Sequence, residues 1–154
     1  MAFEKTPAGT RGKSMPGVNS PVSKWINSVM VRRGRSKGHM MGMDTLVLTT
    51  TGAKTGQRRE TLLGWFPDGD NAWLIVASFG GNAKHPAWYH NLAAHPDQVE
   101  IEVSGRKVRV TPAQLAGAER EAAWQRITTA NNRYAGYATK TDREIPIIRL
   151  TAAA

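Results

Sequence analysis

The hydrophobic positions of this chain follow two periods, and each period indicates a different kind of element. From Asp44 to about residue 78 the pattern is typical of strands, with apolar or β-branched runs at residues 46–51, 60–66 and 72–78. A tight turn at residues 67–71 joins the last two runs, since proline, aspartate, glycine and asparagine all favour turns. The pattern therefore predicts consecutive antiparallel strands.

A hairpin at residues 98–111 gives the clearest pairing signal. A two-residue turn at Ser104-Gly105 brings apolar residues together on one face and opposite charges on the other. The predicted pairs are Ile101 with Val108, Val99 with Val110, Glu102 with Lys107 and Glu100 with Arg109. A shift of one residue would break both sets, so the register is well specified.

A basic amphipathic helix is predicted from Pro21 to Arg33. Ser20-Pro21 provides a start signal, and apolar residues follow at helical spacing: Val22, Trp25, Ile26, Val29 and Met30. The helix is expected to end before Gly34, and residues 34–43 to form a loop. Its apolar face fits two interpretations, packing on the core or lying on a membrane surface with Trp25 at the headgroup level.

Two further helices and a final strand complete the expected elements. A short helix begins at Pro86 and ends at His95-Pro96, and a second runs from Gly117 to about Ala130. A loop containing Tyr134 and Tyr137 precedes a strand at residues 145–150. Mostly antiparallel strands with a few helices predict an α+β domain, expected to be a small barrel. Periodicity alone does not distinguish a barrel from an open sheet.

Composition and length place these elements in one domain. The 154 residues suit a single core, expected over residues 20–154, whereas residues 1–19 are rich in Gly, Pro, Ser and Lys and are expected to form a disordered basic arm. The chain has no cysteine, which excludes disulfides and thiolate chemistry. It has no apolar run resembling a signal peptide or a membrane span, so a cytoplasmic location is expected.

The excess positive charge lies entirely in the first third of the chain. Residues 1–59 hold 11 Lys and Arg against 2 acidic residues, and the rest is balanced at 10 against 10, giving the net charge of +9. This asymmetry predicts an anionic partner, whether a cofactor, a membrane surface or nucleic acid. A non-enzymatic module binding a membrane or nucleic acid is therefore an alternative. Trp25 is the only aromatic residue between Phe3 and Trp65, which disfavours nucleic acid.

The turn after the first long strand carries the candidate anion site. Gly52 and Gly56 bracket Lys54 and Thr55, and Arg59 opens the next strand, so backbone amides and cations converge as they do around phosphates and carboxylates. An ordinary solvated basic hairpin would have the same spacing. The sequence lacks the phosphate-loop motif of nucleotide hydrolases and any Gly-x-Gly-x-x-Gly.

Other chemistry-bearing residues give weaker signals. His85, His90 and His95 are five residues apart, so they cannot form one face of a helix, and no metal site is expected. Ser78 ends an apolar strand just before Phe79-Gly80-Gly81, where the glycines would let a flat ligand approach the backbone. A simple turn at the strand end is the other interpretation.

Several motifs in a fixed order resemble the deazaflavin (coenzyme F420)-dependent nitroreductase family. The resemblance covers about residues 20–150. It lies in Thr49-Thr50-Thr51-Gly52-Ala53-Lys54-Thr55-Gly56-Gln57-Arg58-Arg59, Ala77-Ser78-Phe79-Gly80-Gly81, Pro86-Ala87-Trp88-Tyr89-His90-Asn91-Leu92 and Thr141-Asp142-Arg143-Glu144-Ile145-Pro146-Ile147. It implies a split β-barrel and a reductase that transfers hydride from reduced coenzyme F420 to a quinone, an activated alkene or a nitro compound. The same barrel with flavin mononucleotide is the alternative.

The resemblance also implies a set of site residues. Ser78 and Tyr134 are the candidate catalytic residues, and Tyr134, Tyr137 and Trp25 are the candidates on the substrate side. The expected cofactor-binding residues are Ala53, Lys54, Thr55, Arg59, Leu63, Gly64, Val76, Ala77, Ser78, Phe79, Ala87, Trp88, Tyr89, His90 and Asn91.

This sequence departs from the family pattern at three of its positions. Gly64 and Asn131 stand where the nitroimidazole-reducing member has tyrosines, and Phe79 replaces a lysine. The changes at residues 64 and 131 are expected to alter the shape of the pocket, and the change at residue 79 removes one cation from the cofactor side, so reduction of nitroimidazoles is not carried over. The expected assembly is a monomer or small homo-oligomer, with peripheral membrane contact through the basic helix.

Overall fold

A computed structural model describes residues 3, 5–12, 21–40, 43–81 and 83–153 of the chain. Its strands are β1 (His39–Met40), β2 (Met43–Thr51), β3 (Arg58–Gly64), β4 (Phe66–Pro67), β5 (Ala72–Val76), β6 (Glu100–Val103), β7 (Arg106–Gln114) and β8 (Ile147–Ala152). Its helices are α1 (Pro21–Lys37), α2 (Ala87–Ala94), α3 (Gly117–Ala130) and α4 (Arg133–Thr139), with a short 3-10 helix η1 (Phe79–Gly81).

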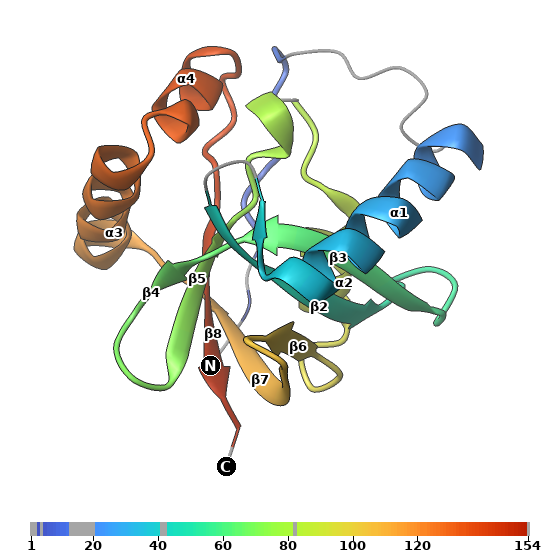
Figure 1. The fold of residues 1–154 in the computed structure, drawn as a ribbon. Helices are drawn as coiled ribbons and strands as arrows, with labels where there is room; N and C mark the ends of the chain where they lie inside the picture. Colours follow the sequence, from blue (N-terminus) through green and yellow to red (C-terminus); the bar gives the residue numbers. More distant parts are fainter. Residues whose placement is uncertain (1–2, 4, 13–20, 41–42, 82, 154) are drawn as a thin grey trace.

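The strands form one curled antiparallel sheet, which confirms the predicted barrel-like α+β fold (Figure 1). Its order is β1-β2-β6-β7-β8-β5-β4, with β3 also paired to β2. The curl brings β3 close to β5, although these strands belong to different ends of the pairing order. The two ends of the sheet thus approach each other as in a split barrel.

The β6–β7 hairpin has the register predicted from the sequence. Ile101 pairs with Val108 and Glu102 with Lys107, and the backbone amide of Val110 donates to the carbonyl of Val99. Both turn residues, at positions 104 and 105, have positive φ angles of 52° and 77°, as a two-residue hairpin turn requires. Pairing of side chains and turn chemistry therefore specify the same geometry.

The predicted strand at residues 60–66 is divided at Trp65. Residues before it, in β3, pair with β2, whereas Phe66 and Pro67, in β4, pair with β5. The backbone amide of Trp65 instead donates to the carbonyl of Asp44 at 3.1 Å. Because of this break, one continuous segment of sequence contributes a strand to each end of the sheet. The alternation of apolar and polar residues does not predict the break.

Strand β5 is buried on both faces, which explains its uninterrupted apolar sequence. Trp73 and Ile75 point into a cluster enclosed by the barrel, together with residues of β2, β6 and α2. Leu74 and Val76 point the other way, into a cluster closed by α3 and α4. Because side chains alternate along a strand, Ser78 continues the face of Val76.

Helices α3 and α4 lie on one side of the sheet and α1 on the other (Figure 1). Helices α2 and α3 have the bounds predicted from the sequence within one residue. Residues 133–139, expected to be loop, form α4 instead, because Tyr134 is buried in the cluster beneath α3 and holds this turn in place. Residues 39–40, also expected to be loop, pair with β2.

Helix α1 ends later and faces another way than the sequence suggests. It continues through Gly34 to Lys37, because a helix-interior glycine costs only about 1 kcal/mol and the positive φ of 67° needed to end the helix occurs at Gly38. It lies against β2 and β3 through Val31, which is buried, and through Asn27, which donates to the carbonyl of Glu60 at 3.1 Å.

The predicted apolar face of α1 points away from the core. Trp25 and Val22 are 68% and 66% exposed, and Ile26 and Met30 are also exposed. These residues are spaced by three and four, whereas Asn27 and Val31 share the opposite face. Packing of the apolar face on the core is therefore the wrong interpretation of this helix.

The first residues of the chain extend along the domain where they are described. The backbone amide of Thr6 donates to the hydroxyl of Tyr89 at 3.0 Å, and that of Gly9 to the carbonyl of Ala83 at 2.8 Å. Asp142 accepts from the backbone amides of Thr10 and Arg11, each at 2.8 Å. The structure thus shows a bonded segment at residues 5–12, where disorder was expected; residues 13–19 of the predicted arm lie outside the described residues.

Candidate active site

A pocket of about 320 Å³ opens where β3, the end of β5, α2 and α4 meet. Its lining is mostly apolar and aromatic and includes a few polar side chains. The lining residues are Thr61, Leu63, Val76, Ser78, Phe79, Pro86, Trp88, Arg133, Tyr134 and Tyr137.

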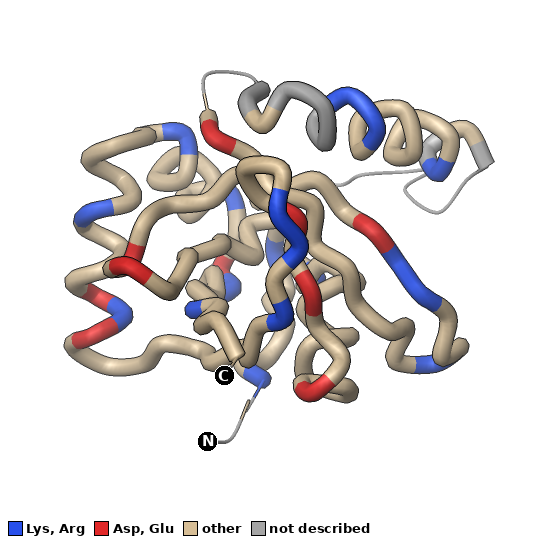
Figure 2. Tube along the Cα trace, turned by 60° about the horizontal axis from the view of Figure 1, so that its bottom comes forward, with Lys and Arg blue, Asp and Glu red and all other residues tan. Residues whose placement is uncertain are grey.

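Strand β3 connects this pocket to the basic turn. Thr61 and Leu63 line the pocket, and alternation places Arg59 on the same face of the strand. One strand step of two residues spans about 6.6 Å, so Arg59 lies just beyond the pocket wall in the direction of the turn. Figure 2 shows Lys and Arg positions along the hairpin of β2 and β3 and along α1.

The opposite wall is formed where β5 ends. Val76 and Ser78 present their side chains on one face of the extended chain, and the 3-10 helix η1 follows immediately. Phe79 lines the pocket with a φ of 47°, a left-handed conformation that is costly for an aromatic residue. This wall is therefore held in an unusual backbone shape.

The tyrosines of α4 form the third wall. Tyr134 and Tyr137 are three residues apart on one helix face, and their rings meet edge to face with centroids 5.8 Å apart. Phe66 packs on the other side of Tyr134 at 5.7 Å. Burial, reinforced by Tyr137, raises the pKa of Tyr134 to about 12. Its hydroxyl therefore stays protonated at neutral pH and acts as a hydrogen-bond donor.

Methionine fills the space that Gly64 leaves beside this wall. A Cβ atom at residue 64 would collide with Met43 Cε and would lie 3.6 Å from the hydroxyl of Tyr134. The hydroxyl of Tyr134 in turn donates to Met43 Sδ at 3.7 Å. At residue 64 the pocket therefore has the expected change of shape, because the flexible thioether of Met43 occupies the space that a larger side chain at this position would fill.

The basic turn after β2 is closed by its own backbone. Gly52 donates to the carbonyl of Gln57 at 2.8 Å, and Gly56 donates to the carbonyl of Gly52 at 2.9 Å. Gly56 has a φ of 69°, which favours glycine there. Lys54 and Thr55 are exposed at the tip. A fixed turn with exposed cations is the geometry expected of an anion site.

Helix α2 ties this turn to the pocket. Trp88 lines the pocket, whereas the side chain of Asn91 accepts from the backbone amide of Ala53 at 2.9 Å and donates to Thr50 Oγ1 at 3.1 Å. Three residues of helix span about 4.5 Å along the axis. The turn and the pocket therefore lie next to each other along α2.

A third cation joins the turn from the N-terminal segment. Lys5 Nζ lies 3.3 Å from Nδ1 of His90, and burial, followed by the charges of Lys5 and Lys54, lowers the pKa of His90. His90 is therefore neutral at pH 7, and the positive potential beside the turn comes from the two lysines.

The structure brings part of the predicted site into the pocket lining. Leu63, Val76, Ser78, Phe79, Trp88, Tyr134 and Tyr137 line it, and their contacts with a cofactor stay predictions. Tyr89 is fully buried and donates to Gln114 Oε1 at 2.6 Å, and Asn91 is buried beneath the turn, so both position other residues. Trp25, on the exposed face of α1, does not line the pocket. The other predicted residues outside the lining are Ala53, Lys54, Thr55, Arg59, Gly64, Ala77, Ala87 and His90.

Three lining residues and Lys5 were missed from the sequence. Thr61 follows from strand alternation between Arg59 and Leu63, and Arg133 directly precedes Tyr134, so both had a usable signal. Pro86 belongs to a family motif and is predicted as a helix start, but not as a lining residue. Lys5 had no local signal, because its approach to His90 depends on how the N-terminal segment packs.

These features fit a planar cofactor ring joined to an anionic tail. The apolar lining suits a flat ring, and backbone groups of the 3-10 helix after Ser78 lie beside the pocket. The cations at residues 5, 54 and 59 suit phosphate or carboxylate groups. Fold and pocket together define a split-barrel protein of the flavin-reductase-like class.

The chain belongs to the F420H(2)-dependent quinone reductase family, whose model matches residues 24–152. It is 48% identical over 110 residues to the F420H(2)-dependent quinone reductase Rv1261c of Mycobacterium tuberculosis (strain ATCC 25618 / H37Rv), covering 70% of this chain and 72% of the relative. Membership confirms the predicted enzyme class, reductase activity and cofactor, coenzyme F420.

Two solved structures are similar in both fold and sequence. An F420-H2 dependent reductase, FDR-A, aligns with a TM-score of 0.61 and 38% identity over 69% of this chain and 92% of that one. A structure described as a domain-swapped dimer aligns with a TM-score of 0.64 and 33% identity over 84% and 96% of the two chains. These likenesses agree with the half-barrel architecture.

Proposed function

We propose that this protein reduces a quinone at the pocket between β3, β5 and α4, using hydride from reduced coenzyme F420. The observation that carries this proposal is the continuity of the site: Leu63 and Thr61 line an apolar pocket, and Arg59 continues the same strand face toward Lys54. An apolar ring and a polyanionic tail need these two environments side by side.

The residues of the chain have separate functions in this reaction. Lys54 and Arg59 bind the anionic tail, while Leu63, Val76 and Trp88 exclude water from the ring. Reduced coenzyme F420, when bound, supplies the hydride. Hydride addition leaves negative charge on a quinone oxygen, and the Tyr134 hydroxyl donates a hydrogen bond to that oxygen. With a pKa of about 12, Tyr134 retains its own proton, so water supplies the proton that completes the hydroquinone.

A binding and turnover experiment tests the cofactor part of this proposal. The protein should oxidise F420H2 in the presence of menadione, and the double substitution Lys54→Ala/Arg59→Ala should weaken binding of F420 by at least about tenfold and reduce its salt dependence. Arg106→Ala/Lys107→Ala, two exposed cations on the β6–β7 hairpin, is the matched control and should bind normally. Unchanged affinity of the first variant would contradict the anion site.

We also propose that α1 binds the surface of an anionic membrane. Its outward face carries Val22, Trp25, Ile26 and Met30, and Arg33 continues the same face at the helix end. Apolar residues flanked by cations on a solvent-facing helix are typical of interfacial helices. Among the residues described, no helix is long and apolar enough to cross a bilayer.

Vesicle binding separates this proposal from contact with a second copy of the chain. Vesicles containing phosphatidylserine should bind the protein and shift the fluorescence of Trp25, whereas phosphatidylcholine vesicles should bind it weakly. Trp25→Glu should abolish binding and preserve turnover with soluble quinone. If the protein binds neither kind of vesicle, and Trp25→Glu converts a dimer to a monomer, then a second protomer covers α1.

A further inference from the structure

Arg143 lies beneath the pocket wall formed by Ser78 and Phe79. Its side chain is buried, with the whole residue 4% exposed. Nη2 donates to the carbonyl of Ser78 at 2.7 Å, and Nη1 donates to the carbonyl of Ala77 at 2.9 Å. One planar guanidinium thus binds two successive carbonyls at the end of β5, directly before the left-handed residue Phe79.

The conformation of Phe79 needs such support. An aromatic residue with a φ of 47° is strained, and this conformation persists only where the surrounding structure holds it in place. The Ser78 carbonyl also accepts from the backbone amide of Gly81 at 3.0 Å, which closes the 3-10 helix. Gly81 in turn packs against α4, because a Cβ atom there would lie 2.9 Å from Lys140 Cβ. Arg143 is therefore the charged part of a clamp on this turn.

The same nitrogen of Arg143 that binds the carbonyl of Ala77, Nη1, also contacts His85. Nη1 of Arg143 lies 2.9 Å from His85 Nδ1, and His85 Nε2 lies 2.8 Å from the carbonyl of Thr6. A carbonyl only accepts, so Nε2 carries the proton and Nδ1 accepts from Arg143. The Arg143 backbone amide also donates to Thr141 Oγ1, which donates to the carbonyl of Arg11 at 2.6 Å. The N-terminal segment thereby helps to orient the arginine.

We infer that Arg143 is a positioning residue for hydride transfer, which holds the backbone at residues 77–79 in the shape that presents Ser78 and Phe79 to the cofactor ring. This inference rests on the proposed function. Arg143 touches neither pocket nor reacting atoms, and it acts through the two carbonyls it binds. Lysine cannot replace it, since one ammonium lacks the planar fork that reaches both carbonyls and His85 together.

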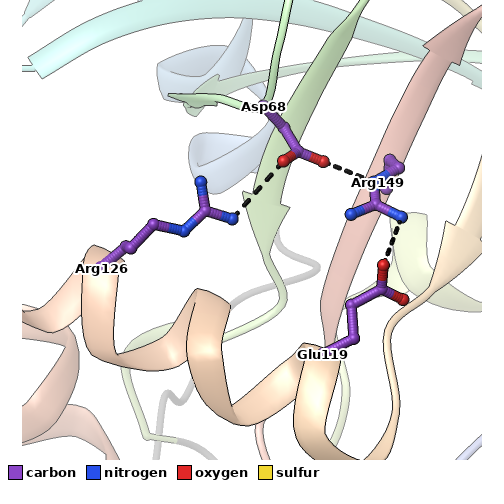
Figure 3. A network of polar contacts seen from close by, with 4 residues as sticks. All are labelled: Asp68, Glu119, Arg126 and Arg149. Carbon is purple, nitrogen blue, oxygen red and sulfur yellow. Dashed lines mark hydrogen bonds and ion pairs between the residues drawn. The ribbon is translucent and has the colours of Figure 1, made fainter.

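The first experiment uses the ligand-free protein and measures amide hydrogen exchange at residues 79–81. Arg143→Lys should accelerate exchange there by about tenfold or more, because the clamp loses charge-assisted hydrogen bonds. Arg149→Lys is the matched control: Arg149 binds Asp68 and Glu119 in a network that also includes Arg126, on the face of the sheet beneath α3 (Figure 3). It should lose stability without changing exchange at residues 79–81. Unchanged exchange in Arg143→Lys overturns the inference.

The second experiment measures turnover of F420H2 with menadione in folded protein. Arg143→Lys should lower kcat by about tenfold or more, with a smaller change in the binding of F420, whose tail is held elsewhere. Guanidinium ion at non-denaturing concentration should restore part of the activity that Arg143→Ala loses. It should leave the activity of Arg149→Ala unchanged. Normal kcat in Arg143→Lys overturns the inference. A wild-type protein that cannot oxidise F420H2 would instead overturn the proposed function, while the exchange result still decides whether Arg143 clamps the turn.

Discussion

The hydroxyl group of Tyr134 donates to the sulfur of Met43 at 3.7 Å, and the same methionine occupies the space above Gly64. The donor is therefore occupied by a weak, flexible acceptor. A quinone oxygen is a stronger acceptor, so the thioether is readily displaced when substrate enters.

Substitution Gly64→Ala should weaken binding of the quinone substrate more than it destabilises the fold. The new Cβ displaces the end of the Met43 side chain, which is flexible, so the free energy of unfolding should fall by no more than about 1 kcal/mol. The displaced methionine then crowds Tyr134, and KM for menadione should rise by up to about tenfold. Steady-state kinetics and thermal unfolding check both values. Gly136→Ala, in open space on α4, is the control and should leave KM unchanged.

Substitution Tyr134→Phe should lower kcat for quinone reduction by about 100-fold, the lower end of the usual loss for one donor to developing negative charge. The pKa of about 12 predicts that wild-type kcat shows no titration of Tyr134 between pH 6 and 9. Tyr137→Phe should have a smaller effect, because Tyr137 packs against the donor. A pH–rate profile with an inflection that disappears in Tyr134→Phe would contradict this assignment.

Stability should fall as the pH drops below about 6.5, partly through His85. Burial is the main cause that lowers the pKa of His85 in the folded protein, and the charges of Arg143 and His90 lower it further. The hydrogen bond to the Thr6 carbonyl acts in the opposite direction and favours protonation. The ring of Tyr89 packs against His85, with the two ring centroids 4.4 Å apart. The unfolded chain therefore binds more protons below pH 6.5, and the stabilisation present above that value is lost as the pH falls through the folded pKa. Urea unfolding from pH 7.5 to 5 measures it, and His85→Gln should flatten the slope.

Asp142 should control the docking of the N-terminal segment. Hydrogen bonds from Thr10 and Arg11 lower the pKa of this carboxyl to about 2, so its contribution is present above about pH 4 and is lost as the pH falls toward 2. Asp142→Asn should accelerate tryptic cleavage after Arg11 at neutral pH, because the acceptor of two backbone amides is weakened. Asp97→Asn, at an exposed position, is the control. Equal cleavage rates would contradict this contact.

The elements with local signals were predictable from the sequence. The β6–β7 hairpin combines a turn with a single matching register, and α2 and α3 have proline or glycine at their starts. The turn at Gly52–Gly56 was predictable for the same reason, as a glycine-bounded segment with exposed cations. In each case the decisive interactions lie within about fifteen residues of chain.

Features set by distant contacts were not predictable in this way. The apolar stripe of α1 fits packing on the core as well as a membrane surface, and only the contacts of Val31 and Asn27 reveal that the opposite face meets the sheet. Arg143 looks like one charged residue in a late loop, because its partners at residues 77, 78 and 85 are remote in sequence. A buried arginine among carbonyls has no periodicity to detect.

The alternation of β3 sets a rule for redesigning this enzyme. Arg59, Thr61 and Leu63 share a strand face, and the number of residues between them keeps the cation in line with the hydrophobic wall. Deleting or inserting a single residue here would turn the guanidinium to the far side while β2 still found partners for most of its backbone. Substrate range is therefore better altered by exchanging side chains at 61 and 63 than by changing loop length, and natural variants with indels at this point should have lost the cofactor before they lost the fold.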